Sequence, residues 1–303
     1  MANAKTIQRT WEKEEFSMSK VAVLSIDVEE WYQLEYFQNS QCDKSQEVLS
    51  EGTRNFIQLI DDENIKATFF IVGDRIKSSL ELSKEIKSRG HEISAHSFNH
   101  IRPLVQSIEE FKQDTLQVKK NLQEHLELKD LGYRAPCFSI DKERYDCLKD
   151  LGYKYDSSKI NAGFHPLYGE LDLIQSKTAW NNVYEENGFY EFELPTVKFL
   201  NKNIPISGGG WLRILPWPLF QYLFRKFIKN SNTFFFFIHP FELTKKEISL
   251  PKDTNFFTRL RFSFGRKKAL SRTQKLIKLL KKNKFEFHTF STFINKIEDE
   301  SKQ

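Results

Sequence analysis

The stretch VAVLSID at residues 21–27 is the first of several short, almost continuous apolar runs along the chain. The runs ATFFIVG at residues 67–73 and TFFFFIH at residues 233–239 have the same character. Such runs are typical of strands that are buried on both faces of a parallel sheet. Segments with helical spacing lie between them, and this alternation predicts a parallel α/β sheet or barrel.

The rest of the chain continues the alternation. Ser107 and Glu110 form a capping box in front of a long helix with one apolar stripe. Further strands are expected near residues 92–96, 132–136, 153–156, 190–196 and 285–290, and helices near residues 47–63, 79–89, 107–126, 141–151, 218–229 and 271–282. With about seven or eight strands and no long linker, we predict one α/β domain, an incomplete barrel of the TIM type.

Composition bounds the class of protein. The 303 residues carry 46 basic and 41 acidic side chains, a net charge of +5 that is too weak to indicate a nucleic-acid partner. The 28 Phe residues exclude a disordered chain. Three Cys without a CxxC pair favour a reducing compartment, so we expect a cytoplasmic protein. No apolar run is long enough to span a membrane.

The two ends of the chain are polar. Residues 1–19 contain no apolar segment of the kind found in secretory signals, and Met18 is a candidate natural start. We therefore expect a polar extension over residues 1–19, the barrel domain over residues 20–297 and a polar tail over residues 298–303.

Polar residues of catalytic type follow the predicted strands. In a parallel barrel the carboxyl ends of the strands share one face, which is the face that carries active sites. The residues that fall at these ends are Asp27, Glu29, His96, His100, Arg134, Asp156 and His239. Their gathering at one edge predicts an active site there.

The pair His96 and His100 has i,i+4 spacing, which would place both imidazoles on one face of a helical turn. Two His and one carboxylate leave open positions, as a catalytic zinc site requires. Glu29 is the better candidate ligand, which leaves Asp27 to act as a base. The alternatives are surface histidines, a solvated loop at Glu29, and an ion pair of Asp27 with Arg134.

His239 ends the run of phenylalanines and has core packing as its alternative reading. Paired with a carboxylate such as Asp156, it would donate a proton to a leaving group. The remaining histidines lack such company and are expected to be structural; they are His91, His125, His165 and His288.

These segments resemble a known family. SIDVEEW, GHEISAHSFNH, GYRAPCFSI, KYDSS and FFIHPFEL are similar, in this order, to the motifs of the polysaccharide deacetylase superfamily, carbohydrate esterase family 4. The stretch PISGGGW at residues 205–211 and the section at residues 255–266 resemble its exosortase-associated branch, found with exopolysaccharide and surface-glycan genes. The resemblance covers about residues 20–295.

The resemblance implies a distorted (β/α)7–8 barrel and a metal-dependent hydrolase that removes N-acetyl groups from amino sugars. Asp27 matches the catalytic base, His96 and His100 the metal-binding histidines, and Arg134 the arginine that orients the base. His239 matches the general acid, and Asp156 stands where the family places the carboxylate that tunes it. The implied cofactor is a divalent metal, most often Zn, with Co, Mn or Ni as alternatives.

The chain departs from the family pattern at two positions. The common motif has two adjacent aspartates, whereas this chain has Asp27-Val28-Glu29, so the metal role passes to Glu29 as in the Asp-x-Asp variant. A metal-independent branch similar to cofactor-free allantoinases stays open if Glu29 points away. Cys137 replaces the usual aromatic residue, although its backbone N–H remains a donor for an oxyanion.

The substrate and partners are less defined. Gly208, Gly209 and Gly210 would allow close approach of a ligand, with a flexible turn as the alternative. Trp211 would stack on a sugar face, with core packing as the alternative. From Arg259 to Lys284 there are eleven Lys or Arg and no Asp or Glu. This charge suggests an anionic partner, such as a membrane surface or a lipid diphosphate, and a solvated helix face is the alternative.

The expected substrate is thus an N-acetylated sugar or lipid-linked glycan in surface-polysaccharide biosynthesis, handled in the cytoplasm or at the inner face of the membrane. Two rival functions remain, a C–N hydrolase of cyclic amides or imides and a non-catalytic glycan-binding protein. No nucleic-acid partner is expected, and a homo-oligomer is left open.

Overall fold

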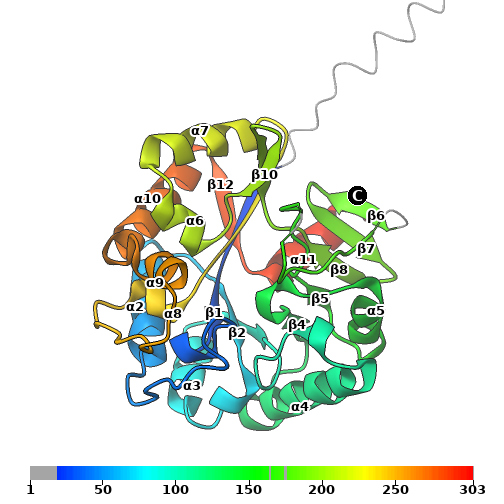
Figure 1. The fold of residues 1–303 in the computed structure, drawn as a ribbon. Helices are drawn as coiled ribbons and strands as arrows, with labels where there is room; N and C mark the ends of the chain where they lie inside the picture. The colour runs from blue at the N-terminus through cyan, green and yellow to red at the C-terminus, as the bar shows by residue number, and fades with distance from the viewer. Residues whose placement is uncertain (1–18, 164, 174–175, 303) are drawn as a thin grey trace, which may run out of the picture.

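A ten-stranded sheet forms the centre of the molecule (Figure 1). The computed structural model describes residues 19–163, 165–173 and 176–302. The strands along the sheet lie in the order β11-β1-β2-β3-β4-β5-β8-β7-β6, and β12 also pairs with β1. Their bounds are β1 Lys20–Val28, β2 Thr68–Ile71, β3 Glu92–Ala95, β4 Gly132–Tyr133, β5 Tyr155–Asp156, β6 Lys177–Trp180, β7 Val183–Glu186, β8 Phe189–Phe192, β11 Thr233–Ile238 and β12 Phe285–His288.

The long strand β1 holds this sheet together. One edge of β1 pairs in parallel with β11, with Ile26 opposite Ile238. Its other edge pairs first with β12 and then with β2, where Asp27 lies opposite Phe70. All neighbours from β11 to β8 are parallel, so the carboxyl ends of these strands meet on one face.

Helices cover the outside of the curved sheet (Figure 1). Each buries one apolar face, as in α4, where the predicted capping box between Ser107 and Glu110 is formed. Their bounds are α2 Leu49–Asp62, α3 Leu80–Ser88, α4 Ile108–Leu126, α5 Lys142–Asp150, α6 Gly209–Ile214, α7 Trp217–Phe227, α8 Pro240–Leu243, α9 Phe256–Ser263, α10 Ala269–Lys282 and α11 Phe290–Glu300. Short 3-10 turns are Trp31–Gln33, Gly73–Arg75, Pro103–Val105, Pro136–Phe138 and Arg266–Lys268.

Aromatic side chains fill the inside of the sheet around the first turn of α11. The ring of Phe290, the first residue of α11, lies 4.7 Å from that of Phe192 and 5.7 Å from that of Phe235. It also lies 5.2 Å from the ring of Tyr155. The backbone N–H of Phe290 donates to Thr68 Oγ1 at the start of β2, and that of Ser291 donates to Glu92 Oε2 at the start of β3, each at 3.3 Å. The first turn of α11 therefore covers the amino ends of these strands, opposite the predicted site residues.

The predicted α/β fold with a single incomplete barrel is confirmed. Among the described residues no strand ladder joins β8 to β11, and contacts such as Asn182 Nδ2 to Ser231 Oγ (2.8 Å) bridge that side instead. The predicted strands and helices are present, but two hairpins were missed, β6–β7, which extends the sheet, and β9 Thr196–Phe199 with β10 Lys202–Pro205. Four helices were also missed, α6, α8, α9 and α11, and α11 continues to Glu300, into the expected polar tail over residues 298–303.

The expected extension over residues 1–19, with Met18, lies outside the described residues except for Ser19. No helix of the described part of the chain is long and apolar enough to cross a membrane.

Candidate active site

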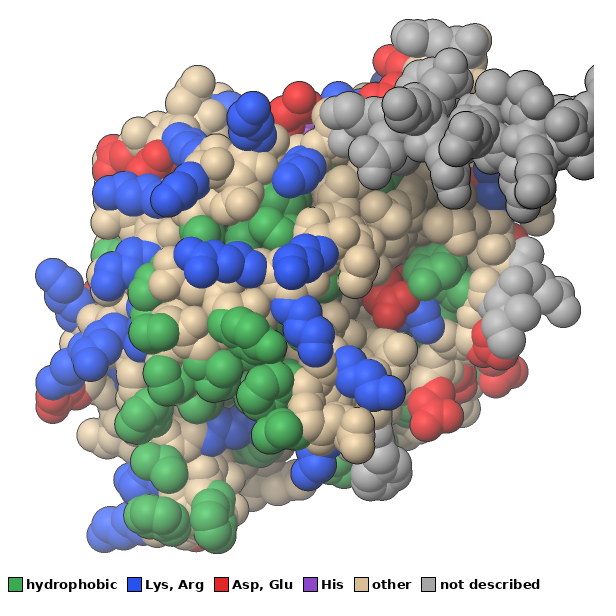
Figure 2. Space-filling view, turned by 90° about the horizontal axis from the view of Figure 1, so that it is seen from above, with side chains coloured by type: hydrophobic (Ala, Val, Ile, Leu, Met, Phe, Trp, Pro, Cys, Tyr) green, Lys and Arg blue, Asp and Glu red, His purple; other side chains and the backbone are tan. Residues whose placement is uncertain are grey.

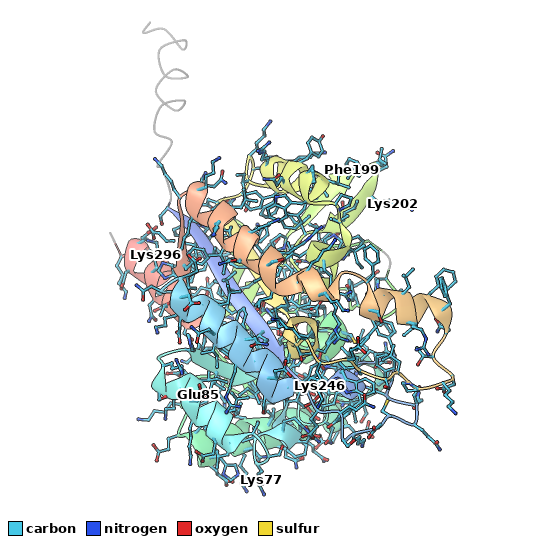
Figure 3. The ribbon with its side chains drawn as sticks, turned by 90° about the vertical axis from the view of Figure 1, so that its left-hand side faces the viewer. Lys77, Glu85, Phe199, Lys202, Lys246 and Lys296 are labelled. Atoms are coloured by element: carbon cyan, nitrogen blue, oxygen red, sulfur yellow. The ribbon has the colours of Figure 1, made fainter. Side chains whose placement is uncertain are left out.

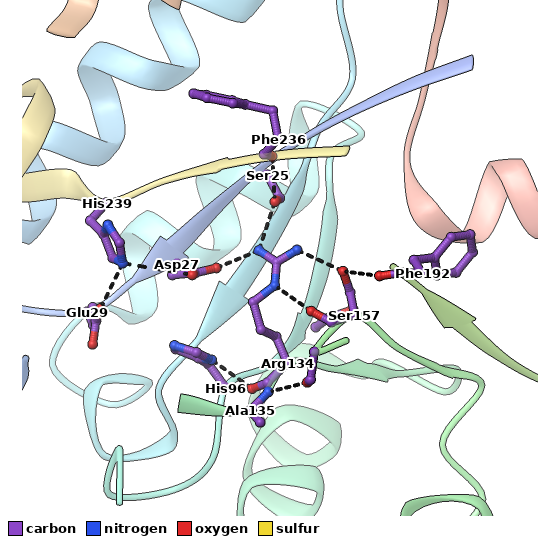
Figure 4. A network of polar contacts seen from close by, with 12 residues as sticks. Ser25, Asp27, Glu29, His96, Arg134, Ala135, Ser157, Phe192, Phe236 and His239 are labelled. Atoms are coloured by element: carbon purple, nitrogen blue, oxygen red, sulfur yellow. Dashed lines mark hydrogen bonds and ion pairs between the residues drawn. The ribbon is translucent and has the colours of Figure 1, made fainter. Parts of the chain in front are cut away.

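The carboxyl ends of four parallel strands bring the predicted residues together (Figure 4). Asp27 is the penultimate residue of β1, and Glu29 follows that strand. His96 comes directly after β3, Arg134 after β4 and His239 after β11. All five side chains are buried or nearly so. The gathering expected from the strand ends is therefore present.

Arg134 fixes the Asp27 carboxylate. Its Nη1 donates to Asp27 Oδ1 at 2.7 Å and to Ser25 Oγ at 2.8 Å, while Nε donates to the carbonyl of Ser157 at 3.1 Å. Burial alone would raise the pKa of Asp27, but the charge of Arg134, helped by His96 and His239, holds it below the ordinary value. Asp27 is thus an ionised, oriented carboxylate.

Glu29, His96 and His100 form a compact set of metal-ligand type. One ligand atom from each lies within 4.8 Å of the others, and all three residues are buried. His96 Nδ1 lies 2.7 Å from the carbonyl of Arg134, so the proton sits on Nδ1 and donates to that carbonyl, and the lone pair of Nε2 is free to bind a metal ion. Burial lowers the pKa of His96 to about 4, which keeps this imidazole neutral.

The donor set fits a divalent cation. Glu29 Oε2 lies 2.5 Å from His100 Nε2 but has no partner in hydrogen-bonding geometry among the described residues. Two imidazoles and one carboxylate with open positions suit zinc and its neighbours. Glu29 points into the site, whereas the metal-independent alternative would need Glu29 to point away.

The histidine pair does not lie on a helical turn, and that prediction is wrong. Residues 96–100 form an irregular bend in which Ser97 and His100 have φ values of 57° and 56°. Ser97 Oγ accepts from the backbone N–H of His100 at 2.8 Å and stabilises the bend. The rings of His96 and His100 still meet, with centroids 5.0 Å apart.

His239 faces the carboxylates of Asp27 and Glu29 through one ring nitrogen and contacts Glu242 through the other. Its Nε2 lies 3.3 Å from Glu29 Oε1 and 3.9 Å from Asp27 Oδ2. Its Nδ1 lies 3.1 Å from Glu242 Oε2, and Glu242 Oε1 accepts from Arg213 Nε at 2.7 Å. Burial lowers the pKa of His239, but Glu242 and Glu29 outweigh this and raise it to about 9.

The expected partnership of Asp156 with His239 is therefore wrong. Asp156 lies opposite Glu191 of β8 in the sheet, and its Oδ1 accepts from Ser158 Oγ at 2.6 Å. Burial raises the pKa of Asp156 to about 6 and that of Glu191 well above its ordinary value. The two carboxyls lie behind the loop whose Ser157 holds Arg134, and their raised pKa values favour a proton held between them.

Sequence reasoning missed Glu242 and Arg213. The signal was available, because His239 and Glu242 have the spacing of a capping box, and Glu242 does accept from the backbone N–H of His239 at 3.1 Å. Arg213 comes from α6, a helix that was not predicted. Its contact with Glu242 depends on packing across distant segments, which no local pattern indicates.

A cavity of about 1070 Å³ lies above the site. Asp27, Glu29, His96, His100 and His239 line it, and its walls include Tyr36, Cys137, Tyr168, Gly208, Gly210, Trp211 and Arg261. Cys137 has a φ of 55°, and burial raises the pKa of its thiol. His165, expected to be structural, also lines the cavity and stacks on Tyr168 with centroids 3.8 Å apart.

The three glycines of the predicted substrate loop have different surroundings. A side chain at Gly209 would come within 2.4 Å of Glu242 Oε2, so this glycine packs against the carboxylate that contacts His239. Gly209 is not among the residues that line the cavity. A side chain at Gly208 would meet the ring of Phe237, whereas Gly210 has nothing within 4 Å. Among the three, the expectation of a ligand-facing glycine thus fails for Gly209.

Comparison with known proteins finds two family matches that together cover most of the chain. Residues 41–155 match the family model described as polysaccharide deacetylase, and residues 157–295 match a domain of unknown function, DUF3473. The peptidoglycan deacetylase of Helicobacter pylori is 23% identical over 193 residues, 63% of this chain and 62% of that protein. The peptidoglycan-N-acetylglucosamine deacetylase of Bacillus cereus is 29% identical over 102 residues, 34% of this chain and 47% of that protein.

The chain thus spans less than two thirds of the length of these two relatives. Among solved structures, one from Mycobacterium smegmatis described as a polysaccharide deacetylase superposes with a TM-score of 0.62 at 16% identity, covering 93% of this chain and 92% of the other. A carbohydrate esterase family 4 pseudoenzyme from Bacillus anthracis gives 0.53 at 13% identity, covering 91% and 66%. At such identities the likeness concerns the fold.

Fold and site together define an incomplete (β/α) barrel protein with carboxylates and histidines at the carboxyl ends of its strands. The two adjoining family matches, over residues 41–155 and 157–295, show that the sequence is of the same class. The chain belongs to the polysaccharide deacetylase superfamily, in the branch marked by the DUF3473 domain.

Proposed function

We propose that this protein is a metal-dependent N-deacetylase that hydrolyses the acetamide of an N-acetylated amino sugar. One observation carries the proposal: the buried set of Glu29, His96 and His100 lies beside the Asp27–Arg134 pair and under a large cavity. The names of the curated relatives, both deacetylases of peptidoglycan, support the same reaction class.

Glu29, His96 and His100 would hold the cation, and zinc is the ion that their donor atoms fit best. When bound, a divalent cation polarises the acetamide carbonyl and lowers the pKa of a water molecule. The carbonyl of Arg134 holds the His96 ring through Nδ1 and so directs Nε2 into the site.

Asp27 is the proposed base. Its carboxylate is ionised and oriented by Arg134, and it accepts the proton of the attacking water. Arg134 also donates to Ser25 and Ser157, and these contacts prevent rotation of its guanidinium group. The orientation of the Asp27 carboxylate is fixed as a result. The backbone N–H of Cys137 is the proposed donor to the oxyanion.

His239 is the proposed acid. Its Nε2 faces Asp27 and Glu29, where the departing amine would form, and the raised pKa keeps this ring protonated near neutral pH. Glu242 holds the ring through Nδ1, so the proton that is delivered comes from Nε2. The products are acetate and a free amino sugar.

The proposed setting is surface-polysaccharide biosynthesis, with a free or lipid-linked N-acetylated glycan as the substrate. The three cysteines are unpaired, which supports a reducing compartment such as the cytoplasm. The cavity wall combines apolar side chains with Lys198, Lys202 and Arg261, so it suits a glycan that carries a negatively charged group.

Acetate release from N-acetylated amino-sugar oligomers, with cyclic amides assayed in parallel, tests the proposal. The purified protein is assayed as isolated, after chelation, and after reloading with Zn, Co, Mn or Ni. We expect release from the amino sugars that chelation removes and reloading restores. Activity on cyclic amides that chelation leaves unchanged would instead establish the metal-independent hydrolase.

A further inference from the structure

Helix α9 presents an apolar face away from the protein. At about 100° per residue, Phe256, Phe257 and Leu260 fall within about 100° of one another around the helix. They are 70%, 79% and 47% exposed, and Phe264 just after the helix is 51% exposed. A helix on the surface of a globular protein normally turns this face inward.

The opposite side of α9 anchors it to the domain. Phe262 is buried, and its ring stacks on that of Phe241 with centroids 4.6 Å apart. Arg213 Nη2 donates to the carbonyl of Arg261 at 2.6 Å, and its Nη1 donates to the carbonyl of Phe264. The exposed face is therefore a fixed feature of the fold.

Positive charge flanks the apolar face. Arg259 and Arg261 lie on either side of it around the helix, and both are exposed. The eleven Lys and Arg from Arg259 to Lys284, without one acidic residue, continue from α9 along α10. Figure 2 shows one face on which hydrophobic side chains gather with Lys and Arg around them.

Helix α9 also lies at the cavity. Its Thr258, Arg261 and Phe262 line one wall, and the β9–β10 hairpin lines another through residues that include Lys198 and Lys202. Figure 3 shows this hairpin, with Phe199 and Lys202, on the side of the molecule to which α9 projects. Leu200 in the turn of the hairpin is 82% exposed.

We propose that α9 docks on an anionic lipid bilayer, with its phenylalanines among the headgroups and the exposed cations that follow it, such as Lys267 and Lys268, on the lipid phosphates. An apolar helix face flanked by cations is the pattern of interfacial membrane helices. A second copy of the chain fits less well. Three phenylalanines bury roughly 150–250 Å² each when fully covered, and these are already partly covered. A stable dimer needs about 800 Å² per partner.

Docking in this way turns the cavity mouth toward the lipid surface, where a membrane-borne substrate would be met. The docking does not depend on the proposed reaction, so it is tested by binding alone. Flotation of the full-length protein is measured with vesicles of phosphatidylcholine and of phosphatidylcholine mixed equally with phosphatidylglycerol. We expect binding to the mixed vesicles that weakens as salt is added.

Variants assign the binding to α9. Phe256→Ser with Phe257→Ser should lower partitioning by about tenfold or more, because it removes most of the inserting area. Val105→Ser with Leu116→Ser removes exposed apolar side chains elsewhere and should bind like the wild type. Lys267→Gln with Lys268→Gln should weaken binding, whereas Lys77→Gln with Lys120→Gln should not.

Either of two vesicle results would overturn the proposal: no binding of the wild type to the mixed vesicles at low salt, or equal binding by the Phe256, Phe257 variant. A concentration-dependent dimer that this variant abolishes, seen by light scattering, would also overturn it by assigning the face to a second copy. Thermal unfolding checks each variant, and Leu260→Ser replaces the double variant if that one does not fold.

Discussion

The replacement Glu242→Gln tests how the proposed acid is held. One oxygen of Glu242 contacts both Nδ1 and the backbone N–H of His239, and the other accepts from Arg213 Nε. Glutamine keeps the shape and one acceptor oxygen for Arg213, but it removes the negative charge behind the imidazole. Removal of the whole side chain would leave Arg213 buried without its partner, so the isosteric change is preferable.

The magnitude follows from the contact that is lost. A hydrogen bond to a charged group contributes about 1.5–3 kcal/mol. Because this contact stabilises the protonated imidazole, its loss should lower the pKa of His239 from about 9 toward the ordinary value. At a pH above 9 kcat should then fall by roughly 10- to 150-fold, and near pH 7 it should fall much less. Metal content should be unchanged, because Glu242 contacts none of the proposed metal ligands.

The assay is steady-state acetate release, with kcat and KM determined separately. Asp156→Asn is the matched control, since Asp156 contacts Glu191 and Ser158 and should cost much less in kcat. If Asp156→Asn reduced kcat more than Glu242→Gln in folded, metal-loaded protein, the assignment of Glu242 as the positioning residue would be refuted.

Two further predictions concern stability. Gly209→Ala places a Cβ 2.4 Å from Glu242 Oε2 and 2.7 Å from Ile238, so it should destabilise the protein by about 1–3 kcal/mol; Gly210→Ala, with nothing within 4 Å, should leave the melting temperature nearly unchanged. The raised pKa values of Asp156 and Glu191 mean that the folded state binds more protons than the unfolded state, so this pair's stabilisation is full below pH 3.8 and falls as pH rises through about 6. Glu191→Gln mimics the protonated acid and should flatten this fall in urea titrations across that range; an unchanged pH dependence would contradict the shared proton.

The barrel and most of its site could be predicted because the site residues directly follow apolar runs that are recognisable as strands. Asp27, His96 and His239 each end an apolar run, and parallel strands place such ends together. The antiparallel β6–β7 hairpin was missed, since its residues are largely polar or half-buried and give no continuous apolar run.

Other features depend on tertiary contacts that the sequence pattern does not indicate. Asp156 was assigned to His239, but sheet register places it beside Glu191 instead. The apolar residues of α9 would be read as a core-facing stripe, whereas the packing of Phe262 on Phe241 turns them outward. The bend at His96 and His100 depends on two residues at positive φ that spacing alone does not predict.

The most direct test of the central claim is metal content measured together with acetate release in two variants. Asp27→Asn removes the proposed base and leaves the ligands, so it should retain about one equivalent of metal and lose about 10²–10⁴-fold of the activity. Glu29→Gln should lose both, while His125→Asn serves as a control and should lose neither. If Glu29→Gln retained full metal and full acetate release, the account of this site would be contradicted.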